Sequence, residues 1–132
     1  MVSKNKEDYL RALYLFNEEK KKLNVTNLSK ALKISKPSVS QMIKILSDEN
    51  FLRYKKYSEI KVTKKGLNAS KNLTIKHRII ETFLKEVLKL NLKEVHSEAH
   101  KLEHAISNKT ILKLRKFLKN PKCDPHGKEI PS

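Results

Sequence analysis

Three histidines recur every fourth residue in the second half of the sequence, at His96, His100 and His104, and Glu103 lies beside the last of them. At about 100° per residue, these four side chains fall within an arc of about 100° on one face of a predicted helix. Imidazole and carboxylate groups that face one way suit a divalent first-row metal ion. The spacing therefore predicts a metal-binding face.

A second pair, His77 and Glu81, repeats the same four-residue spacing on the preceding predicted helix. Two helices that fold back on each other would present both groups to one region. A single histidine more often bonds a backbone carbonyl than a metal, so the prediction rests on the whole set. That set is His77, Glu81, His96, His100, Glu103 and His104.

Catalysis has little support in the sequence. A hydrolytic zinc site needs an open coordination position and a general base, and the His-Glu-x-x-His motif is absent. No serine or cysteine is flanked by a recognisable nucleophile motif. We therefore predict that the chain is not an enzyme.

Charge points to a polyanionic partner. The 132 residues contain 30 Lys+Arg against 14 Asp+Glu, for a formal net charge of +16. A well-solvated, lysine-rich surface is the alternative, but nucleic acid is favoured. No stretch pairs a basic face with a large aromatic one, which argues against a membrane surface. The lack of a long apolar run, of an apolar N-terminus and of any cysteine other than Cys123 predicts a cytoplasmic protein without disulfides.

Hydrophobic periodicity predicts a mainly α-helical chain with one hairpin. A short second helix would begin at Thr26 or Asn27 as N-cap, and a third at Ser35, with Pro37 in its first turn. The predicted helices cover residues 6–23, 26–32, 37–50, 65–90, 93–106 and 109–119, the hairpin strands cover 51–54 and 60–63, and residues 120–132 form an irregular extension.

Helix, short helix, turn, helix and hairpin follow one another in the order of a winged helix-turn-helix, whose third helix enters the major groove of DNA. Val39, Ile43 and Leu46 form its apolar face, which leaves a polar face of serine, glutamine and lysine. Serine and glutamine pair with base edges and lysine with phosphates, and the hairpin tip adds further lysines. The predicted DNA-binding residues are Ser35, Lys36, Pro37, Ser38, Ser40, Gln41, Lys44, Lys55 and Lys56.

With these motifs in view, the chain resembles the diphtheria toxin repressor family of iron- and manganese-dependent transcriptional repressors. The likeness covers nearly the whole chain. The matching segments are Glu7-Asp8-Tyr9-Leu10-Arg11, Pro37-Ser38-Val39-Ser40-Gln41, Lys76-His77-Arg78, the run from Val95 to His104 and the closing run from Asp124 to Pro131.

The resemblance implies roles for the matching positions. It implies a winged helix-turn-helix domain over residues 1–64 and an all-helical dimerisation and metal-binding domain over 65–132. A primary metal site would use Asp8, His100, Glu103 and His104. An ancillary site would use His77, Glu81 and His96, with Cys123 and His126 of the tail as further candidates.

Two departures bear on the metal. Asp8 stands where iron-dependent members usually carry methionine and His100 where they often carry cysteine, so the primary site is all nitrogen and oxygen and leans toward manganese. Arg11, however, stands where short manganese regulators place a glutamate. We therefore expect Mn²⁺ or Fe²⁺, with Zn²⁺ as a third candidate. Many members continue into an SH3-like domain where this sequence stops, so we expect a naturally short member or one cut at the domain boundary.

The resulting prediction is a homodimeric repressor of metal-homeostasis genes that binds an inverted-repeat operator in duplex DNA when metal is bound. Two alternatives stay open. One is a metal-independent winged-helix regulator with a histidine-rich dimer domain, and the other is a small metal-binding enzyme or metal carrier whose basic charge is incidental.

Overall fold

The computed structural model describes residues 4–55 and 59–132. In this part of the chain there are six α-helices and one two-stranded sheet, which confirms the mainly α fold class. The chain forms two compact units that divide between Lys71 and Asn72, within one long helix. The boundary placed after residue 64 from the sequence stays a prediction. No helix among the described residues is both long and apolar enough to cross a lipid bilayer.

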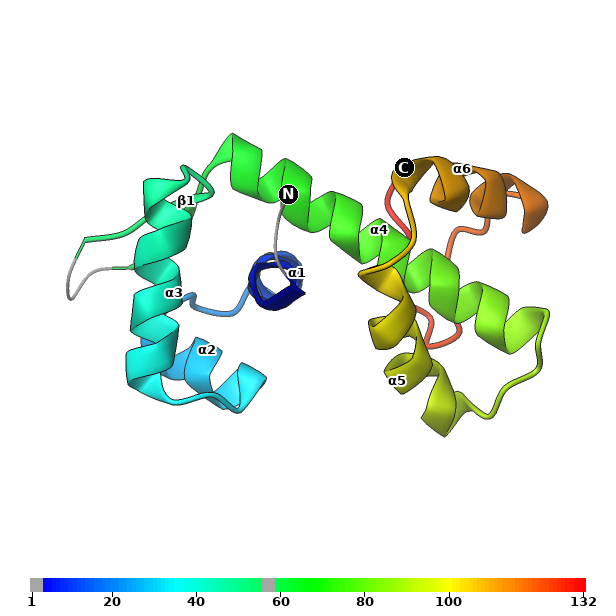
Figure 1. The fold of residues 1–132 in the computed structure, drawn as a ribbon, viewed down its shortest axis with the longest axis horizontal. Helices are drawn as coiled ribbons and strands as arrows, with labels where there is room; N and C mark the ends of the chain where they lie inside the picture. Colours follow the sequence, from blue (N-terminus) through cyan, green and yellow to red (C-terminus); the bar gives the residue numbers. More distant parts are fainter. Residues whose placement is uncertain (1–3, 56–58) are drawn as a thin grey trace. The chain divides into compact units, whose positions relative to one another are not determined.

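The first unit contains α1 (Lys4–Glu18), α2 (Val25–Leu32), α3 (Lys36–Asp48) and the hairpin (Figure 1). Apolar residues of the three helices recur at helical spacing, and buried apolar side chains also come from the loop after α1 and from the hairpin. The buried apolar side chains of this unit are Tyr9, Leu10, Ala12, Leu13, Phe16, Leu23, Leu28, Val39, Ile43, Leu46, Phe51, Leu52 and Ile60. A Lys6–Glu49 ion pair adds a contact between α1 and the residue after α3.

The turn between α2 and α3 has the capping chemistry of a helix-turn-helix. Lys33 takes a left-handed conformation (φ 56°) after the end of α2. Ser35 then caps α3, because its hydroxyl accepts the backbone N–H of Ser38 at 3.3 Å, and Pro37 lies in the first turn. The predicted cap of α3 is therefore confirmed.

A short antiparallel hairpin follows α3. Strand β1 (Leu52–Arg53) pairs with β2 (Lys61–Val62), and Leu52 lies opposite Val62. The N–H of Ile60 donates to the carbonyl of Leu23 at 3.3 Å, which attaches the hairpin to the loop after α1. The hairpin is thus the wing of a winged helix-turn-helix, with paired strands shorter than the sequence predicts.

The second unit contains the main part of α4 (Lys64–Glu86) together with α5 (Leu92–Glu103) and α6 (Asn108–Phe117). Side chains of all three helices and of the tail form its core. The buried members are Ile79, Ile80, Leu84, Val95, Ala99, Ile111 and Ile130. Because Ile130 belongs to this core, the tail is part of the fold.

Several predicted boundaries were wrong by a few residues. Helix α1 ends at Glu18 instead of residue 23, since the chain turns at Lys20 with φ 55°. The cap of α2 is Asn24, whose side chain accepts the N–H of Asn27 at 2.7 Å, and neither Thr26 nor Asn27 takes that place. Helix α4 ends at Glu86, ahead of a left-handed residue at Lys89 (φ 58°).

The tail contains no helix or named strand, as predicted, but it is a structured turn and not a loose extension. A β-bridge joins Cys123 to Glu129, and the N–H of Gly127 donates to the carbonyl of Asp124 at 3.0 Å. Asp-Pro-x-Gly is a sequence typical of such a turn, because aspartate bonds the backbone ahead of it and glycine accepts positive φ. Gly127 indeed has φ 83°.

At Gly66, the first turn of α4 approaches the backbone of the wing closely. A Cβ atom at this position would lie 1.8 Å from the carbonyl oxygen of Phe51, which is backbone and cannot move aside cheaply. We expect Gly66→Ala to lower the free energy of unfolding by about 2–3 kcal/mol, through overpacking. Urea denaturation followed by circular dichroism measures this. Asn68→Ala, at an exposed position of the same helix, is the control, and equal midpoints for the two variants would contradict the close approach.

Candidate metal centre and DNA-reading surface

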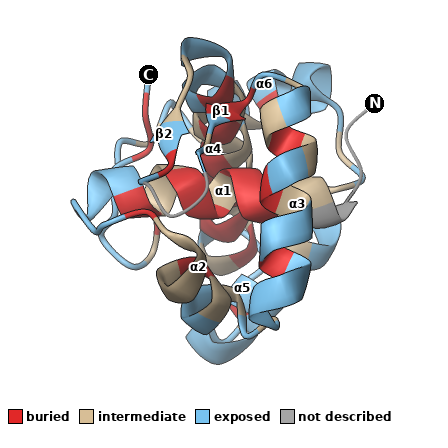
Figure 2. Cartoon of the chain, turned by 90° about the vertical axis from the view of Figure 1, so that its left-hand side faces the viewer, coloured by how far each residue is buried: buried red, intermediate tan, exposed pale blue. Residues whose placement is uncertain are grey.

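Helix α3 presents a polar face to solvent. Val39, Ile43 and Leu46 are fully buried on one side, and buried and exposed residues alternate along the helix in Figure 2. All seven predicted DNA-binding positions in and before the helix are exposed: Ser35, Lys36, Pro37, Ser38, Ser40, Gln41 and Lys44. An exposed face that combines hydroxyl, amide and ammonium groups has the chemistry to contact base edges and phosphates in a major groove.

The wing tip carries the remaining predicted DNA contacts. Lys55 is exposed, and it is the last residue described before residues 56–58. Lys56 lies outside the described residues, so its prediction stands on sequence alone. At the base of the wing, the ammonium group of Lys65 lies 4.5 Å from the ring centroid of Phe51 and donates to the carbonyl of Glu49 at 2.8 Å. The wing base is therefore tied to the start of α4.

Asp8, the predicted ligand in the first unit, is half-buried on α1. It lines a hollow of about 360 Å³ together with Ser38 and Gln41 of the DNA-reading face. The other lining residues are Tyr9, Ile34, Met42 and Ile45. Burial raises the pKa of the Tyr9 hydroxyl, so this side chain is a neutral phenol near pH 7. The hollow places the Asp8 carboxylate beside the recognition helix.

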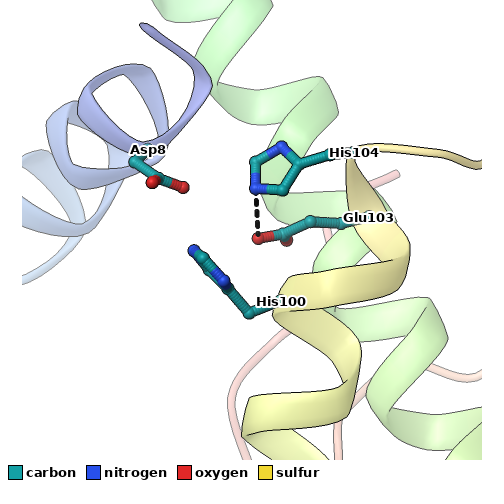
Figure 3. Close-up of side chains that lie close together, drawn as sticks. All are labelled: Asp8, His100, Glu103 and His104. Atoms are coloured by element: carbon teal, nitrogen blue, oxygen red, sulfur yellow. Dashed lines mark ion pairs between the residues drawn. The ribbon is translucent and has the colours of Figure 1, made fainter. Parts of the chain in front are cut away.

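Three predicted ligands gather at the end of α5. One ligand atom from each of His100, Glu103 and His104 lies within 4.8 Å of the others. Figure 3 shows these side chains and marks the ion pair between His104 Nε2 and a Glu103 oxygen at 3.8 Å. Asp8, also drawn there, belongs to α1 of the other unit. Glu103 is only 2% exposed, so its carboxylate needs a charged or hydrogen-bonding partner.

The other predicted ligands gather between α4 and α5. Ligand atoms of His77, Glu81 and His96 also lie within 4.8 Å of one another. His77 Nε2 lies 3.3 Å from a Glu81 oxygen, and His96 Nδ1 lies 3.5 Å from the second Glu81 oxygen. The sequence pattern placed His96, His100, Glu103 and His104 on one face of α5, and the structure divides that face between two clusters.

Glu81 gives a test of whether the second cluster fits a metal ion. Its side chain is 3% exposed, and its Oε2 atom lies 3.5 Å from His96 and 3.6 Å from His126, beyond hydrogen-bond distance of both imidazoles. Burial raises the pKa of Glu81. The hydrogen bond from His77, the close approach of His96, and the charges of His77 and His126 lower it more, so its pKa lies well below the ordinary value. An ionised, buried oxygen among imidazoles fits a divalent cation.

The tail contributes His126 to this region. Glu81, Asp124 and His126 form a further group with ligand atoms within 4.8 Å. The Asp124 carboxylate is already engaged, since Oδ1 accepts the N–H groups of His126 at 2.9 Å and Lys128 at 2.8 Å. Its Oδ2 lies 4.0 Å from Nε of Arg78. We therefore assign Asp124 to holding the turn, and His126 is the tail group left to face Glu81.

Cys123, the other tail candidate, is exposed, and no potential metal group found among the described residues includes it. Sequence reasoning had missed the anchors of the tail. Nη1 of Arg78 donates to the carbonyl of Glu129 at 2.6 Å, and Nη2 of Arg115 donates to the carbonyl of Pro131 at 2.8 Å. The Asp-Pro-x-Gly sequence was the only available signal for the turn, and no local pattern announces its partner 51 residues away.

Comparison with known proteins gives a family match for each half of the chain. The family model "Iron dependent repressor, N-terminal DNA binding domain" matches residues 1–60. The model "Iron dependent repressor, metal binding and dimerisation domain" matches residues 63–132. A helix-turn-helix transcriptional regulator of Methanocaldococcus jannaschii is 37% identical over 118 residues, which are 89% of this chain and 94% of that protein. The chain belongs to the iron-dependent repressor family.

Two further relatives match nearly the whole of this chain but only part of their own length. The iron-dependent repressor IdeR of Mycobacterium tuberculosis is 34% identical over 125 residues, which are 95% of this chain and 54% of that protein. The structure of the manganese regulator SloR superimposes with a TM-score of 0.85 at 38% identity and covers 96% of this chain and 59% of its own. The chain thus spans little more than half of these two relatives.

Family membership decides the class of protein. The chain combines a DNA-binding domain with a metal-binding and dimerisation domain, so it is a metal-dependent, DNA-binding transcriptional repressor and not an enzyme. The winged helix-turn-helix predicted from the order of elements is confirmed by the fold and by the family model.

The Asp124 contacts give a prediction about the tail of this repressor. Asp124→Ala removes the acceptor of two backbone N–H groups and leaves the buried Arg78 without its carboxylate neighbour. We expect it to lower the free energy of unfolding by about 2 kcal/mol. Hydrogen exchange of residues 122–130 should also become faster, measured by mass spectrometry. Cys123→Ser, at the exposed neighbouring position, is the control, and slow exchange in Asp124→Ala would show that other contacts hold the turn.

Proposed function

We propose that Mn²⁺ or Fe²⁺ activates this repressor to bind an inverted-repeat operator as a homodimer, and that it controls genes of metal homeostasis. The observation that carries the proposal is the gathering of His100, Glu103 and His104 at the end of α5 in a chain whose α3 exposes a DNA-reading face. A repressor of this kind works in the cytoplasm, beside the DNA that it reads.

The primary site in this proposal consists of Asp8, His100, Glu103 and His104. The ancillary site consists of His77, Glu81 and His96, with His126 as the favoured tail ligand and Cys123 as the weaker candidate. Nitrogen and oxygen ligands without sulfur suit Mn²⁺ and Fe²⁺, and Zn²⁺ accepts them too. Relatives named an iron-dependent repressor and a manganese regulator fit the same two ions.

Arg11 bears on how many ions the primary site takes. It lies one helical turn after Asp8 and is half-buried on the same helix. A fixed guanidinium charge near Asp8 disfavours a second divalent ion close to the first, because like charges repel at short range. We therefore infer one ion in the primary site and a separate one in the ancillary site.

The mechanism that we propose runs through α1. A metal ion held by Asp8 together with His100, Glu103 and His104 would attach α1 to the dimerisation domain. Asp8 shares its hollow with Ser38 and Gln41, so the position of α1 bears directly on the start of the recognition helix. In a two-fold dimer, this attachment would set the separation and tilt of both recognition helices to match two half-sites. By linkage, operator DNA tightens metal binding by the same factor.

Metal-dependent operator binding is the direct test. Chelated protein is titrated against a duplex with an imperfect inverted repeat from its own upstream region, and Mn²⁺, anaerobic Fe²⁺ or Zn²⁺ is then added at fixed salt. We expect a gain in affinity of at least about tenfold, or 1.4 kcal/mol, with Mn²⁺ or Fe²⁺. Equal binding with and without metal would contradict the proposal and favour a metal-independent regulator.

Asp8→Ala is the matching variant. Loss of the α1 ligand should remove the gain produced by metal while the fold and the dimer persist, as checked by circular dichroism and sedimentation. Glu7→Ala, which removes the neighbouring half-buried carboxylate of the same helix, serves as the control and should keep the gain. An Asp8→Ala protein that still responds to metal would show that Asp8 is not a ligand.

The DNA-reading face gives a separate prediction. Gln41→Ala should reduce the ratio of operator to non-specific affinity by about tenfold, since a bidentate amide–base contact contributes about 1–3 kcal/mol to discrimination. Lys55→Ala should instead lower the slope of log affinity against log salt by about one, for any sequence. Fluorescence anisotropy over a range of salt concentrations separates the two effects. Identical behaviour of the two variants would contradict the division into base-reading and phosphate-binding residues.

A further inference from the structure

His77 belongs to the ligand cluster between α4 and α5, and it also contacts the ligand cluster at the end of α5. It is buried on α4 with 6% exposure. Its Nδ1 atom lies 2.8 Å from Oε2 of Glu103, which belongs to the cluster at the end of α5. Its Nε2 atom lies 3.3 Å from Glu81 and 3.3 Å from His96, the other members of the second cluster. One imidazole ring therefore spans the space between the clusters.

The chemistry of the ring gives its two nitrogens different tasks. Oε2 of Glu103 is an acceptor, so we assign the 2.8 Å contact to a proton on Nδ1 that points at this oxygen. When a metal ion replaces the proton on Nε2, the lone pair of this atom faces Glu81 and His96. This is the arrangement in which metal-binding histidines are commonly found, with one nitrogen on the metal and the other donating to a carboxylate.

The two carboxylate oxygens of Glu103 also face different neighbours. Its Oε2 accepts from His77, and its Oε1 lies 3.8 Å from Nε2 of His104, inside the cluster at the end of α5. The carboxylate is 2% exposed, so water contributes little to its orientation. The hydrogen bond from His77 is therefore well placed to decide how the Glu103 carboxylate is turned toward its own cluster.

We propose that His77 couples the two metal sites: its Nδ1–H orients the carboxylate of Glu103 for the primary site while its Nε2 binds the ancillary ion. This inference rests on the proposed function, because it takes both clusters as metal sites. His77 acts as a ligand in one site and as a positioning residue in the other. An ion on Nε2 fixes the ring and its tautomer, which strengthens the hold on Glu103.

The coupling has a definite sign. Occupancy of the ancillary site raises the affinity of the primary site, and by linkage the primary ion raises the ancillary affinity by the same factor. Outer-shell partners of metal ligands typically contribute about 10- to 100-fold in affinity. Loss of the Nδ1–H···Glu103 bond should therefore weaken the primary site even when the ancillary site is empty.

Two substitutions at one position separate the two tasks of His77. His77→Ala removes both nitrogens. His77→Asn removes the metal-binding Nε2 but keeps an amide N–H near the position of Nδ1, from which it can still donate to Glu103. His96→Ala removes an ancillary ligand for which the structure gives no contact with Glu103. The full-length dimer is titrated with Co²⁺, and calorimetry gives affinity and stoichiometry while visible absorption gives the ligand environment.

We expect wild-type protein to bind two Co²⁺ per chain and each variant to lose the ancillary ion. The remaining site should be weakened about 10- to 100-fold in His77→Ala relative to His96→Ala. In His77→Asn, the affinity of the remaining site should be at least about tenfold higher than in His77→Ala. Its absorption spectrum should also be closer to that of the primary site in the wild type. Circular dichroism and sedimentation establish that all four proteins are folded dimers.

Equal primary-site affinity in all three variants would overturn the coupling. Equal weakening in His77→Ala and His77→Asn would overturn it too, because packing and not the hydrogen bond would then be the cause. Failure of the proposed function has a different signature, since the wild-type protein itself would then take up one Co²⁺ or none, or would bind its operator equally with and without metal.

Discussion

The structure of the second unit depends on the need to balance two carboxylates in its interior. Glu81 and Glu103 are each 2% exposed, and an unpaired charge at that depth would cost several kcal/mol. Imidazoles from α4, α5 and the tail surround these carboxylates, and His77 contacts both. The histidines of α5 and His126 of the tail are the groups that meet this requirement. In the function that we propose, the same side chains are the ligands of divalent cations.

In the first unit, the governing constraint is geometric. Val39, Ile43 and Leu46 are fully buried, which fixes the rotation of α3 about its axis and leaves Ser40, Gln41 and Lys44 exposed. The polar face needs no structural partner and can vary with the DNA sequence that it reads. Metal chemistry and DNA reading are thus built on separate cores, while α1 carries a carboxylate beside the recognition helix.

Most of the fold could be predicted from the sequence because its signals are local. Ser35 and Pro37 define the start of α3, and helical periodicity defines its buried side. The cap of α2 was missed because Asn24, Thr26 and Asn27 are all good capping residues, and only the tertiary structure selects among them. For the candidate site, spacing found the ligand-bearing face of α5. It did not divide that face into two clusters, because the division depends on where α4 lies. The tail anchors were missed for the same reason, since Arg78 acts on Glu129 across 51 residues.

The close approach at Gly66 has a consequence for how such a protein diverges. The first turn of α4 lies against the backbone of Phe51 so closely that no side chain fits between them. The base of the wing and the start of α4 must therefore be inherited together as one rigid piece. Lys55 takes no part in this close approach. We therefore expect a change in the length or charge of the loop between the strands to be tolerated, and a side chain at position 66 to be rejected.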